Sequence, residues 1–336
     1  MNLLNLHNVW QASNLPDGLT LEDGEISGTP TTSGSYTVPI TVINELGTST
    51  KNINIRVKGK DVVTIMQNGA VLETTTFTAL QASIQDGTAQ SKYNCTNTQM
   101  LIDLVHPKTG SFILDVPVNF CDFRTVTLQD GTTKTGLILQ FANPLWKGFA
   151  PFGTNSFNRW KYSQLRKWLN ASGSDWFTSS YTADVLTPHA GSYTDAGVKG
   201  FLACLPSALA DMLLTIKVTT QAFFDDNNTD TAIDDPDYIN GFDADVTYDK
   251  VFIPSLSEMG ISAGNNENYP EDDFEGTAWT RHSGFTDMNG DPCVLNTRSA
   301  VINGTDKIIT VDSTLQPIVS DVYNANTATA PTFVLG

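Results

Sequence analysis

This sequence has few charged residues, and positively charged residues are especially scarce. Only 16% of its 336 residues are charged, and 19 Lys and Arg stand against 36 Asp and Glu, for a net charge of −17. A nucleic-acid partner needs a basic side chain for each phosphate that is contacted. The composition therefore argues against nucleic acid as a partner, and equally against an anionic membrane surface.

Long hydrophobic runs are lacking as well. No stretch of about 18 consecutive apolar residues occurs, so we predict no membrane span. Residues 1–7 have neither a basic region nor a long apolar core, so we expect no secretory signal. Thr, Asn, Ser and Gly are abundant instead, as in β-rich surface proteins. This combination favours a virion protein that is released by lysis and lies on the virion exterior.

Cysteine is scarce. The four thiols form no C-x-x-C pair and no zinc-site spacing; they are Cys95, Cys121, Cys204 and Cys293. We expect reduced, mostly buried thiols rather than a disulfide framework. A Cys95–Cys121 link is the main alternative, because the two residues flank a strand-rich stretch.

Catalytic fingerprints are missing too. The G-x-S-x-G, H-E-x-x-H, Walker and dinucleotide-binding patterns do not occur. No pair of aspartates stands out as a glycosidase pair. The histidines are scattered, with none at ligand spacing: His7, His106, His189 and His282. We therefore predict a protein that is not an enzyme and requires no cofactor.

Turn residues divide the first part of the chain into short strands. Asp17-Gly18 and Asp23-Gly24 tolerate positive φ, and Pro30 fixes the backbone before the next strand. From residue 36 to 42, apolar and polar side chains alternate, which predicts a half-buried strand.

These segments resemble a known family. The blocks LPDGLTL at 15–21, GEISGTP at 24–30 and GSY at 34–36 resemble the signature of immunoglobulin-like (Ig-like) modules of bacteria and phages. The resemblance implies a β-sandwich module over residues 1–58 that spaces, displays or binds at cell and virion surfaces. Because a complete Ig sandwich needs about 100 residues, we expect either a trimmed module that lacks its first strands, with open strand edges, or a sheet that another chain or the next segment completes.

We predict a β-rich middle segment over residues 59–145. The segments 124–128 and 133–139, joined by Asp130-Gly131, predict a hairpin. The strand candidates of this segment are 62–66, 101–105, 111–116 and 137–141.

Residues 146–336 carry the only helical patterns. One helix is expected from a Ser156 cap through Trp160 and Trp168, and another over residues 206–214. Two tryptophans eight residues apart on one helix favour a core position over a sugar-stacking pair.

Four blocks of this segment resemble an uncharacterised domain family of phage, prophage and bacterial surface proteins. In order, they are NRW at 158–160 with SQLRKWLN at 163–170, DKVFIPS at 249–255 with SEMG at 257–260, WTR at 279–281 and PTFVL at 331–335. That family is likened to C-type lectins and formylglycine-generating enzymes, so the resemblance implies a lectin-like α+β domain over 146–336. Formylglycine chemistry needs paired cysteines near the C-terminus, and only Cys293 lies there, so we expect no such activity.

The long acidic insert at 223–248 is the best metal candidate. Asp226, Asn228 and Asp230 have the D-x-N-x-D spacing of a calcium loop. An EF-hand would have Gly at 231 and Glu at 237, and this chain has neither. A solvated acidic loop explains the same residues without a metal, so Ca²⁺ is an optional ligand.

A second candidate site is a loop-like aromatic segment. Trp279, Arg281 and His282 lie between two glycines and could bind a ligand by stacking and hydrogen bonds. A structural Trp and Arg, which the resemblance implies at these positions, is the alternative.

Together these patterns predict a mostly β fold with a smaller α+β part: an Ig-like β-sandwich module, a β-rich middle and a C-type-lectin-like α+β domain. The expected function is that of a phage virion surface protein that displays the lectin-like domain for attachment to host glycan. The alternative is a capsid decoration or head-fibre protein without a specific ligand. Other virion proteins, bound through the Ig-like module, are the expected partners. Self-association into a homo-oligomer is left open.

Overall fold

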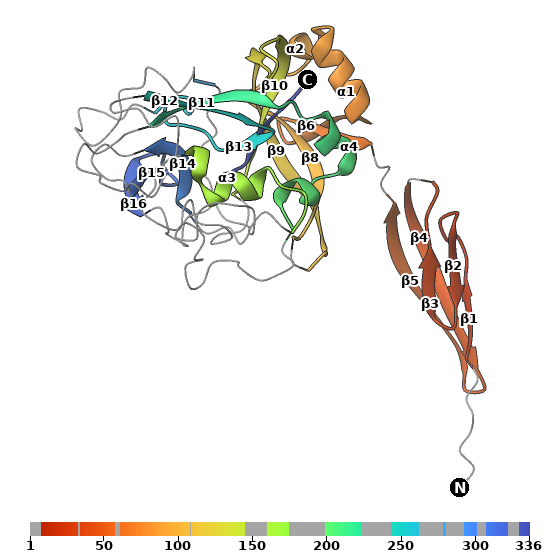
Figure 1. Ribbon diagram of the computed structural model, residues 1–336. Coiled ribbons are helices and arrows are strands. Elements are labelled where there is room, and N and C mark those ends of the chain that lie inside the picture. The colour runs from red at the N-terminus through yellow and green to blue at the C-terminus, as the bar shows by residue number, and fades with distance from the viewer. Residues whose placement is uncertain are drawn as a thin grey trace. The chain divides into compact units, whose positions relative to one another are not determined.

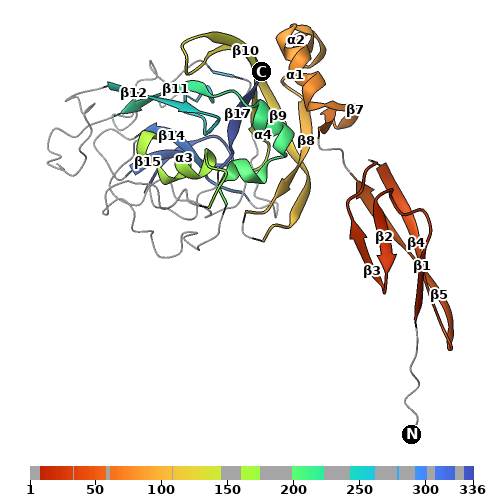
Figure 2. The ribbon, with the colours of Figure 1, turned by 45° about the vertical axis from the view of Figure 1, so that its right-hand side comes forward.

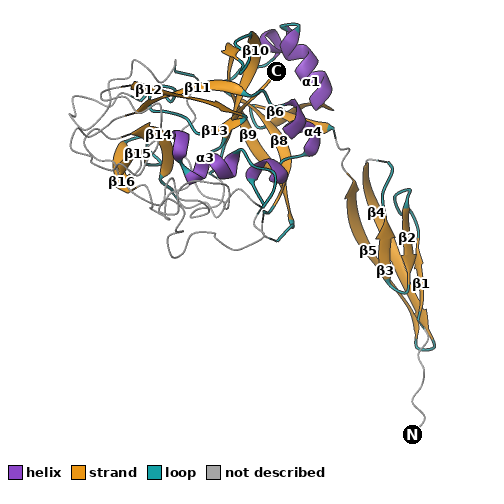
Figure 3. Ribbon diagram, viewed as in Figure 1, coloured by secondary structure: helices purple, strands orange, loops and turns teal. Residues whose placement is uncertain are grey.

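The computed structural model describes two compact units, residues 1–62 and 63–336. Within them, the described residues are 8–32, 34–57, 61–107, 109–144, 160–174, 199–222, 243–261, 278–279, 292–300, 307–321 and 329–336. Strands dominate both units and the helices are few and short (Figure 3). The predicted fold class, mostly β with a smaller helical part, is confirmed.

The N-terminal unit consists of a three-stranded antiparallel sheet, in the order β1-β4-β5, and a separate β2–β3 hairpin (Figure 1). Its strands are β1 (Val9–Ala12), β2 (Leu19–Glu22), β3 (Glu25–Gly28), β4 (Gly34–Asn44) and β5 (Gly47–Val57).

Alternation along β4 and β5 gives this sheet one apolar face. Tyr36 lies opposite Ile55 and Val38 opposite Ile53, and Val38 is fully buried. The polar residues between them point to the other face, where the Thr41 and Thr50 hydroxyls are hydrogen bonded across the strands at 2.9 Å. The half-buried strand predicted from this pattern is confirmed.

Two glycines of the Ig-like signature are required by a close backbone approach. Gly18 has φ +89° and Gly28 has φ +114°, conformations that side-chain-bearing residues rarely adopt. A Cβ on Gly18 would lie 2.1 Å from the Thr29 carbonyl oxygen, and one on Gly28 would lie 2.2 Å from the Gly18 carbonyl oxygen. The start of β2 and the end of β3 can therefore touch only because both positions lack a side chain.

The second unit is built on a seven-stranded sheet, in the order β13-β17-β10-β9-β8-β6-β7, in which the strand pairs with a defined register are antiparallel. The predicted hairpin around Asp130-Gly131 is the β9–β10 pair. The strands are β6 (Val62–Gln67), β7 (Ala70–Thr76), β8 (Thr98–Val105), β9 (Phe112–Thr127), β10 (Thr133–Phe141), β13 (Val251–Phe252) and β17 (Thr332–Leu335).

This sheet crosses the boundary that the sequence predicts between residues 145 and 146. Strand β17, from the C-terminus, pairs with β10, and β13 pairs with β17. The apolar side chains of the two segments share one core, in which the Phe141 ring meets the Phe333 ring edge-on at 5.9 Å. A separate core for the middle segment is therefore not needed.

Two helices lie in the middle segment, where the sequence analysis expects only strands: α1 (Phe77–Gln85) and α2 (Thr88–Lys92). The expectation of helices in only two places is wrong. The overlooked signal is local, because the Thr76 hydroxyl caps α1 by accepting from Ala79 N at 3.0 Å. Phe77, Leu80 and Ile84 then bury one helical face.

The helix expected from Ser156 is divided. Trp160 lies in a 3-10 turn, η1 (Trp160–Tyr162), and α3 (Gln164–Leu169) begins only after Ser163. Ser163 has extended backbone angles and its hydroxyl accepts from Arg166 N at 3.0 Å, so Ser163 caps the helix. Ser156 itself lies outside the described residues. The second expected helix is confirmed as α4 (Ser207–Met212), preceded by η3 (Phe201–Cys204).

Two small antiparallel sheets complete the unit (Figure 2). One is the hairpin β11 (Ile216–Ala222) and β12 (Asp243–Asp249); the other contains β14 (Leu295–Ala300), β15 (Lys307–Val311) and β16 (Pro317–Asp321). The end of the expected acidic loop, from residue 243 onward, is thus strand β12. Val246 and Tyr248 alternate there with buried polar residues, which gives a strand pattern that the many aspartates obscure in the sequence.

Candidate functional site

A β-bulge in β9 aligns a row of polar side chains on the sheet. Asp122 pairs with Ile138, but Phe120 pairs with Leu139, so Cys121 is an extra residue with no partner opposite in the described β9–β10 pair. Side chains on a strand alternate between faces, and an extra residue shifts that alternation by one. Asp122 and Arg124 therefore share the face of Asn119 instead of pointing to the opposite one.

We call this row, with its two neighbours across the strands, the β9 polar strip: Gln99, Asn119, Asp122, Arg124 and Gln140. Gln99 and Gln140 lie directly opposite Asn119 on β8 and β10. The Gln99 amide donates to Asn119 Oδ1 at 2.8 Å. Gln140 is 2% exposed, and within the described part of the chain its Nε2 has no hydrogen-bond partner. The strip therefore begins in the interior with an unused donor.

The other end of the strip reaches solvent. Arg124 Nε donates to Asp122 Oδ2 at 2.8 Å, and the two side chains are 23% and 37% exposed. Arg124 Nη2 also donates to the Ala278 carbonyl at 3.3 Å, and its guanidinium lies 5.6 Å from the Trp279 ring centroid. A carboxylate, a guanidinium and an indole are thus brought together at this end.

Trp279, a predicted ligand residue, is largely enclosed. It is 7% exposed, and its ring lies 6.4 Å from that of Phe252. Its backbone N–H donates to the Glu258 carbonyl at 2.9 Å. The indole therefore supports Arg124 at the strip more than it offers a free stacking face. Arg281 and His282, the other two predicted ligand residues, lie outside the described residues.

The thiols near the strip are protonated at neutral pH. Burial, and in second place the charge of Asp122, raises the pKa of Cys95 to about 11. Burial raises the pKa of Cys121 further above its ordinary value, with added effects of Cys95 and Asp122. A thiol nucleophile acts as thiolate. These cysteines are therefore packing residues, and none of the four, all in the described ranges, forms a disulfide.

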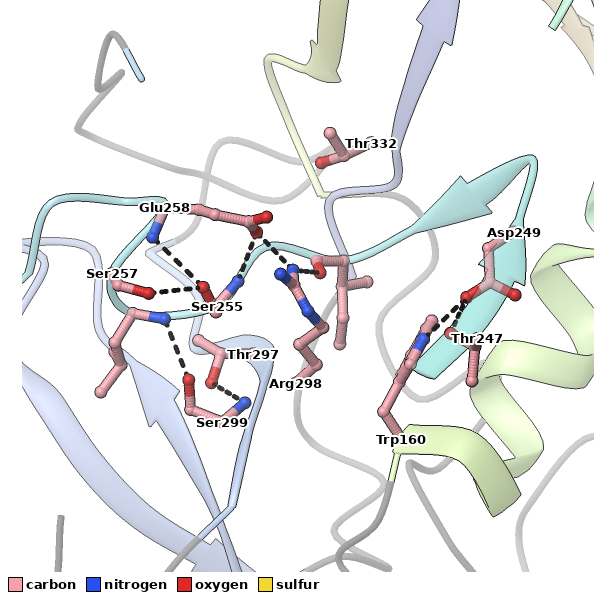
Figure 4. Close-up of polar contacts among 12 residues, drawn as sticks. Trp160, Thr247, Asp249, Ser255, Ser257, Glu258, Thr297, Arg298, Ser299 and Thr332 are labelled. Atoms are coloured by element: carbon pink, nitrogen blue, oxygen red, sulfur yellow. Dashed lines mark hydrogen bonds and ion pairs between the residues drawn. The ribbon is translucent and has the colours of Figure 1, made fainter. Parts of the chain in front are cut away.

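The blocks that resemble the phage and prophage family form buried joints. Asp249 is fully buried and accepts three hydrogen bonds through its carboxylate: from Trp160 Nε1 at 3.0 Å, Arg166 Nε at 2.7 Å and Thr247 Oγ1 at 2.7 Å. Figure 4 shows Trp160 and Thr247 converging on it. The first and second blocks are therefore fastened to each other.

Asn170 forms the next joint. Its Oδ1 accepts from Lys250 N at 2.8 Å and Val251 N at 3.1 Å, and its Nδ2 donates to the Val251 carbonyl at 2.8 Å. The amide thus ties the end of α3 to the start of β13. Lys250 Nζ extends the joint by donating to the Ala210 carbonyl in α4 at 3.2 Å.

The remaining joint surrounds Arg298. Ser255 and Glu258 bond reciprocally, Ser255 N to Glu258 Oε2 at 3.0 Å and Glu258 N to Ser255 Oγ at 3.2 Å (Figure 4). The Glu258 carboxylate pairs with Arg298, which is 1% exposed and donates to the Ile253 carbonyl at 2.7 Å. The sequence analysis missed Arg298; an arginine between hydroxyl residues in a strand gave no motif to find it by.

In these joints, the polar groups of the motif blocks bind other parts of the chain and are not available to a ligand. The described residues contain no group of three His, Cys, Asp or Glu side chains placed to hold a metal ion. The predicted calcium residues Asp226, Asn228 and Asp230 lie outside the described residues. The β9 polar strip combines side-chain donors and acceptors with exposure to solvent at one end, and we take it as the candidate site.

None of the helices in the described ranges has the length and hydrophobicity needed to cross a lipid bilayer.

Comparison with known proteins identifies the N-terminal unit. Residues 6–58 match the family model described as a putative Ig domain. No curated protein and no solved structure matches the chain. The match spans strands β1 to β5. It includes Gly18 and Gly28, the two glycines that allow β2 and β3 to approach each other closely. The chain therefore carries an N-terminal Ig-like domain.

Proposed function

We propose that this chain is a surface protein of a phage virion that attaches to glycan on the host surface without catalysing a reaction. Its composition supports this role, since charge is low and hydroxyl and amide side chains are abundant. The Ig-like domain supports it too, because such modules space and display other domains. In this proposal the second unit is the recognition unit.

The observation that carries the proposal is the bulge at Cys121. It places Asn119, Asp122 and Arg124 on one face of β9, although neighbouring residues of a regular strand would alternate. Amide, carboxylate and guanidinium groups supply the donors and acceptors that sugar hydroxyls need. Bulges recur where a strand aims side chains at a ligand, and this one assembles such a set at the solvent boundary.

The Ig-like domain is the proposed attachment to other virion proteins. Strands β1 and β5 lie at the two edges of its sheet, and each pairs only with β4 among the described strands. An edge strand presents unpaired backbone groups that can pair with a strand of another chain. This supports docking through the domain edge, with the second unit left for display.

A glycan array probed with the purified full chain tests the proposal. Arg124→Ala should lower binding at least about tenfold if the guanidinium contacts sugar, in keeping with the 1.5–3 kcal/mol typical of charged hydrogen bonds. Lys217→Ala is the matched control, because it removes one positive charge from an exposed position on β11. Equal binding by the wild type, Arg124→Ala and Lys217→Ala proteins would contradict the assignment of the strip.

The second candidate function is capsid decoration or a head fibre without a specific ligand. It is favoured by the motif blocks, whose polar groups form internal joints rather than an open site. Labelled antibody and electron microscopy of virions distinguishes the two. A regular distribution over the capsid, together with no signal on glycan arrays, would favour decoration.

A further inference from the structure

The Asp122 carboxylate uses only one of its two oxygens within the fold. Arg124 donates to Asp122 Oδ2 from Nε, at 2.8 Å, and also from Nη2. In the described part of the chain, every hydrogen bond of the Asp122 side chain ends at this oxygen. The side chain is 37% exposed, and a carboxylate oxygen has lone pairs that accept hydrogen bonds. The partly exposed carboxylate therefore keeps Oδ1 as an acceptor for a donor from outside the chain.

The partner of this carboxylate is itself held in place. Arg124 Nη2 donates to the Ala278 carbonyl at 3.3 Å, and the guanidinium carbon lies 5.6 Å from the centroid of the Trp279 ring. Trp279 is 7% exposed, so the guanidinium is supported by an enclosed side chain. An ordinary surface ion pair loses side-chain entropy when it is ordered, and a preorganised pair avoids most of that cost on binding. Asp122 is thus a fixed acceptor before a ligand arrives.

The strip has no net positive charge to offer an anion. The positive charge of Arg124 is balanced by Asp122, and the other members of the strip are uncharged amides. The chain as a whole has a net charge of −17. A carboxylate or phosphate of a ligand bound here would lie beside the Asp122 carboxylate, and like charges placed together across an interface are unfavourable. The strip therefore fits a ligand that donates a hydrogen bond and carries no negative charge.

We propose that the β9 polar strip selects neutral sugars, with a sugar hydroxyl donating to Asp122 Oδ1 and Arg124 acting as the residue that positions the carboxylate. This inference rests on the proposed attachment to glycan and deepens it by naming the ligand class. A hydroxyl that donates to an ionised carboxylate forms a shorter and stronger hydrogen bond than one that donates to a neutral acceptor. Sialic acids, uronic acids and sugar phosphates are rejected by the same group.

Matched glycans printed on one array test the selection. Each neutral oligosaccharide is printed beside a counterpart that ends in a uronic or sialic acid, and the full chain is applied to both. The wild type should bind the neutral member of a pair at least about tenfold more tightly. Asp122→Asn keeps the size of the side chain and removes its charge, so it should weaken binding to the neutral member and narrow that ratio. Asp211→Asn is the matched control, because it removes one negative charge from an exposed position on α4.

Arg124 is tested through the same ratio. Arg124→Ala leaves the carboxylate without its cation, so it should weaken binding to the neutral member and widen the preference for it over the acidic member. Arg124→Lys keeps a positive charge beside Asp122 and should recover part of the lost binding, although it cannot donate from a planar fork. A loss of stability alone would lower the signal of both members equally and leave the ratio unchanged.

The outcomes separate this inference from the proposed function. Wild-type binding that is equal for both members, or stronger for the acidic one, overturns the selection of neutral sugars and leaves attachment to glycan standing. A ratio that Asp122→Asn does not change also overturns it, because another residue then sets the preference. Absence of binding to every printed glycan overturns the proposed function, and the selection with it.

Discussion

Asp249 and Arg166, 83 residues apart, form an ion pair whose carboxylate is completely buried, with Arg166 Nε 2.7 Å from Asp249 Oδ1. Asp249→Ala would leave the Arg166 guanidinium and the Trp160 indole N–H without their acceptor. Breaking a buried pair by removing one partner costs about 3–5 kcal/mol. We expect a loss of that size in the free energy of unfolding of the second unit, measured by urea denaturation.

The half-exposed pair of Asp122 and Arg124 provides the comparison for that measurement. Asp122→Asn should change the free energy of unfolding by no more than about 1 kcal/mol, because solvent screens the pair. Similar losses for the two aspartate variants would show that burial does not set the strength of the Asp249 pair.

Trp168→Ala should destabilise the second unit by about 3–5 kcal/mol. The indole is 1% exposed, packs on Phe201 with ring centroids 5.5 Å apart, and donates to the Lys199 carbonyl at 3.2 Å. The melting temperature measures the loss. An unchanged melting temperature together with lost glycan binding would instead make Trp168 a sugar-stacking residue.

Local patterns predicted much of the second unit, and long-range pairing did not follow from them. The hairpin at Asp130-Gly131 and the helix after Pro206 depend on turn and cap residues close in sequence. The pairing of β17 with β10 joins segments almost 200 residues apart. Nothing in either strand specifies the other, because any apolar strand could cover that edge. The boundary expected near residue 145 was drawn without this contact.

The site shows the same limit. The resemblance blocks contain Asp249, Asn170 and Glu258, but the roles of these residues as joints depend on partners elsewhere in the chain and did not follow from the blocks. The β9 polar strip was missed because its residues share a face only through the bulge at Cys121. A strict alternation read from the sequence separates Asn119 from Asp122, so no periodic pattern could reveal the row.

Lys167 should make stability depend on pH in the alkaline range. Burial lowers the pKa of its ammonium group from 10.5 to about 8 in the folded protein. Between these values the unfolded chain holds the proton that the folded chain has lost, so the destabilisation caused by burying this lysine decreases as pH rises. The free energy of unfolding of the wild type, minus that of Lys167→Met, should therefore increase from pH 8 to 10. A constant difference over that range would contradict the lowered pKa.

The cysteines should react slowly in the folded protein. Burial raises the pKa of Cys95 to about 11 and that of Cys204 to about 12, so little thiolate is present at pH 7. Treatment with iodoacetamide should label Cys95 first, because it is the half-buried one. After denaturation without reductant, mass spectrometry should find all four thiols labelled. A Cys95–Cys121 crosslinked peptide would show that the expected reduced state is wrong.

Deleting residues 1–58 should abolish incorporation into virions and leave the second unit folded. The Ig-like domain lies within a compact unit of its own. Its only fully buried large apolar side chain in the described part is Val38, so the domain has little interior of its own and strand edges open to other chains.

Circular dichroism and melting of the truncated protein check folding, and quantitative blotting of purified particles checks incorporation. The truncated chain should keep the glycan binding proposed for the second unit, since the β9 polar strip lies within it. If it still assembles onto particles, the anchor lies in the second unit and the two parts have exchanged roles.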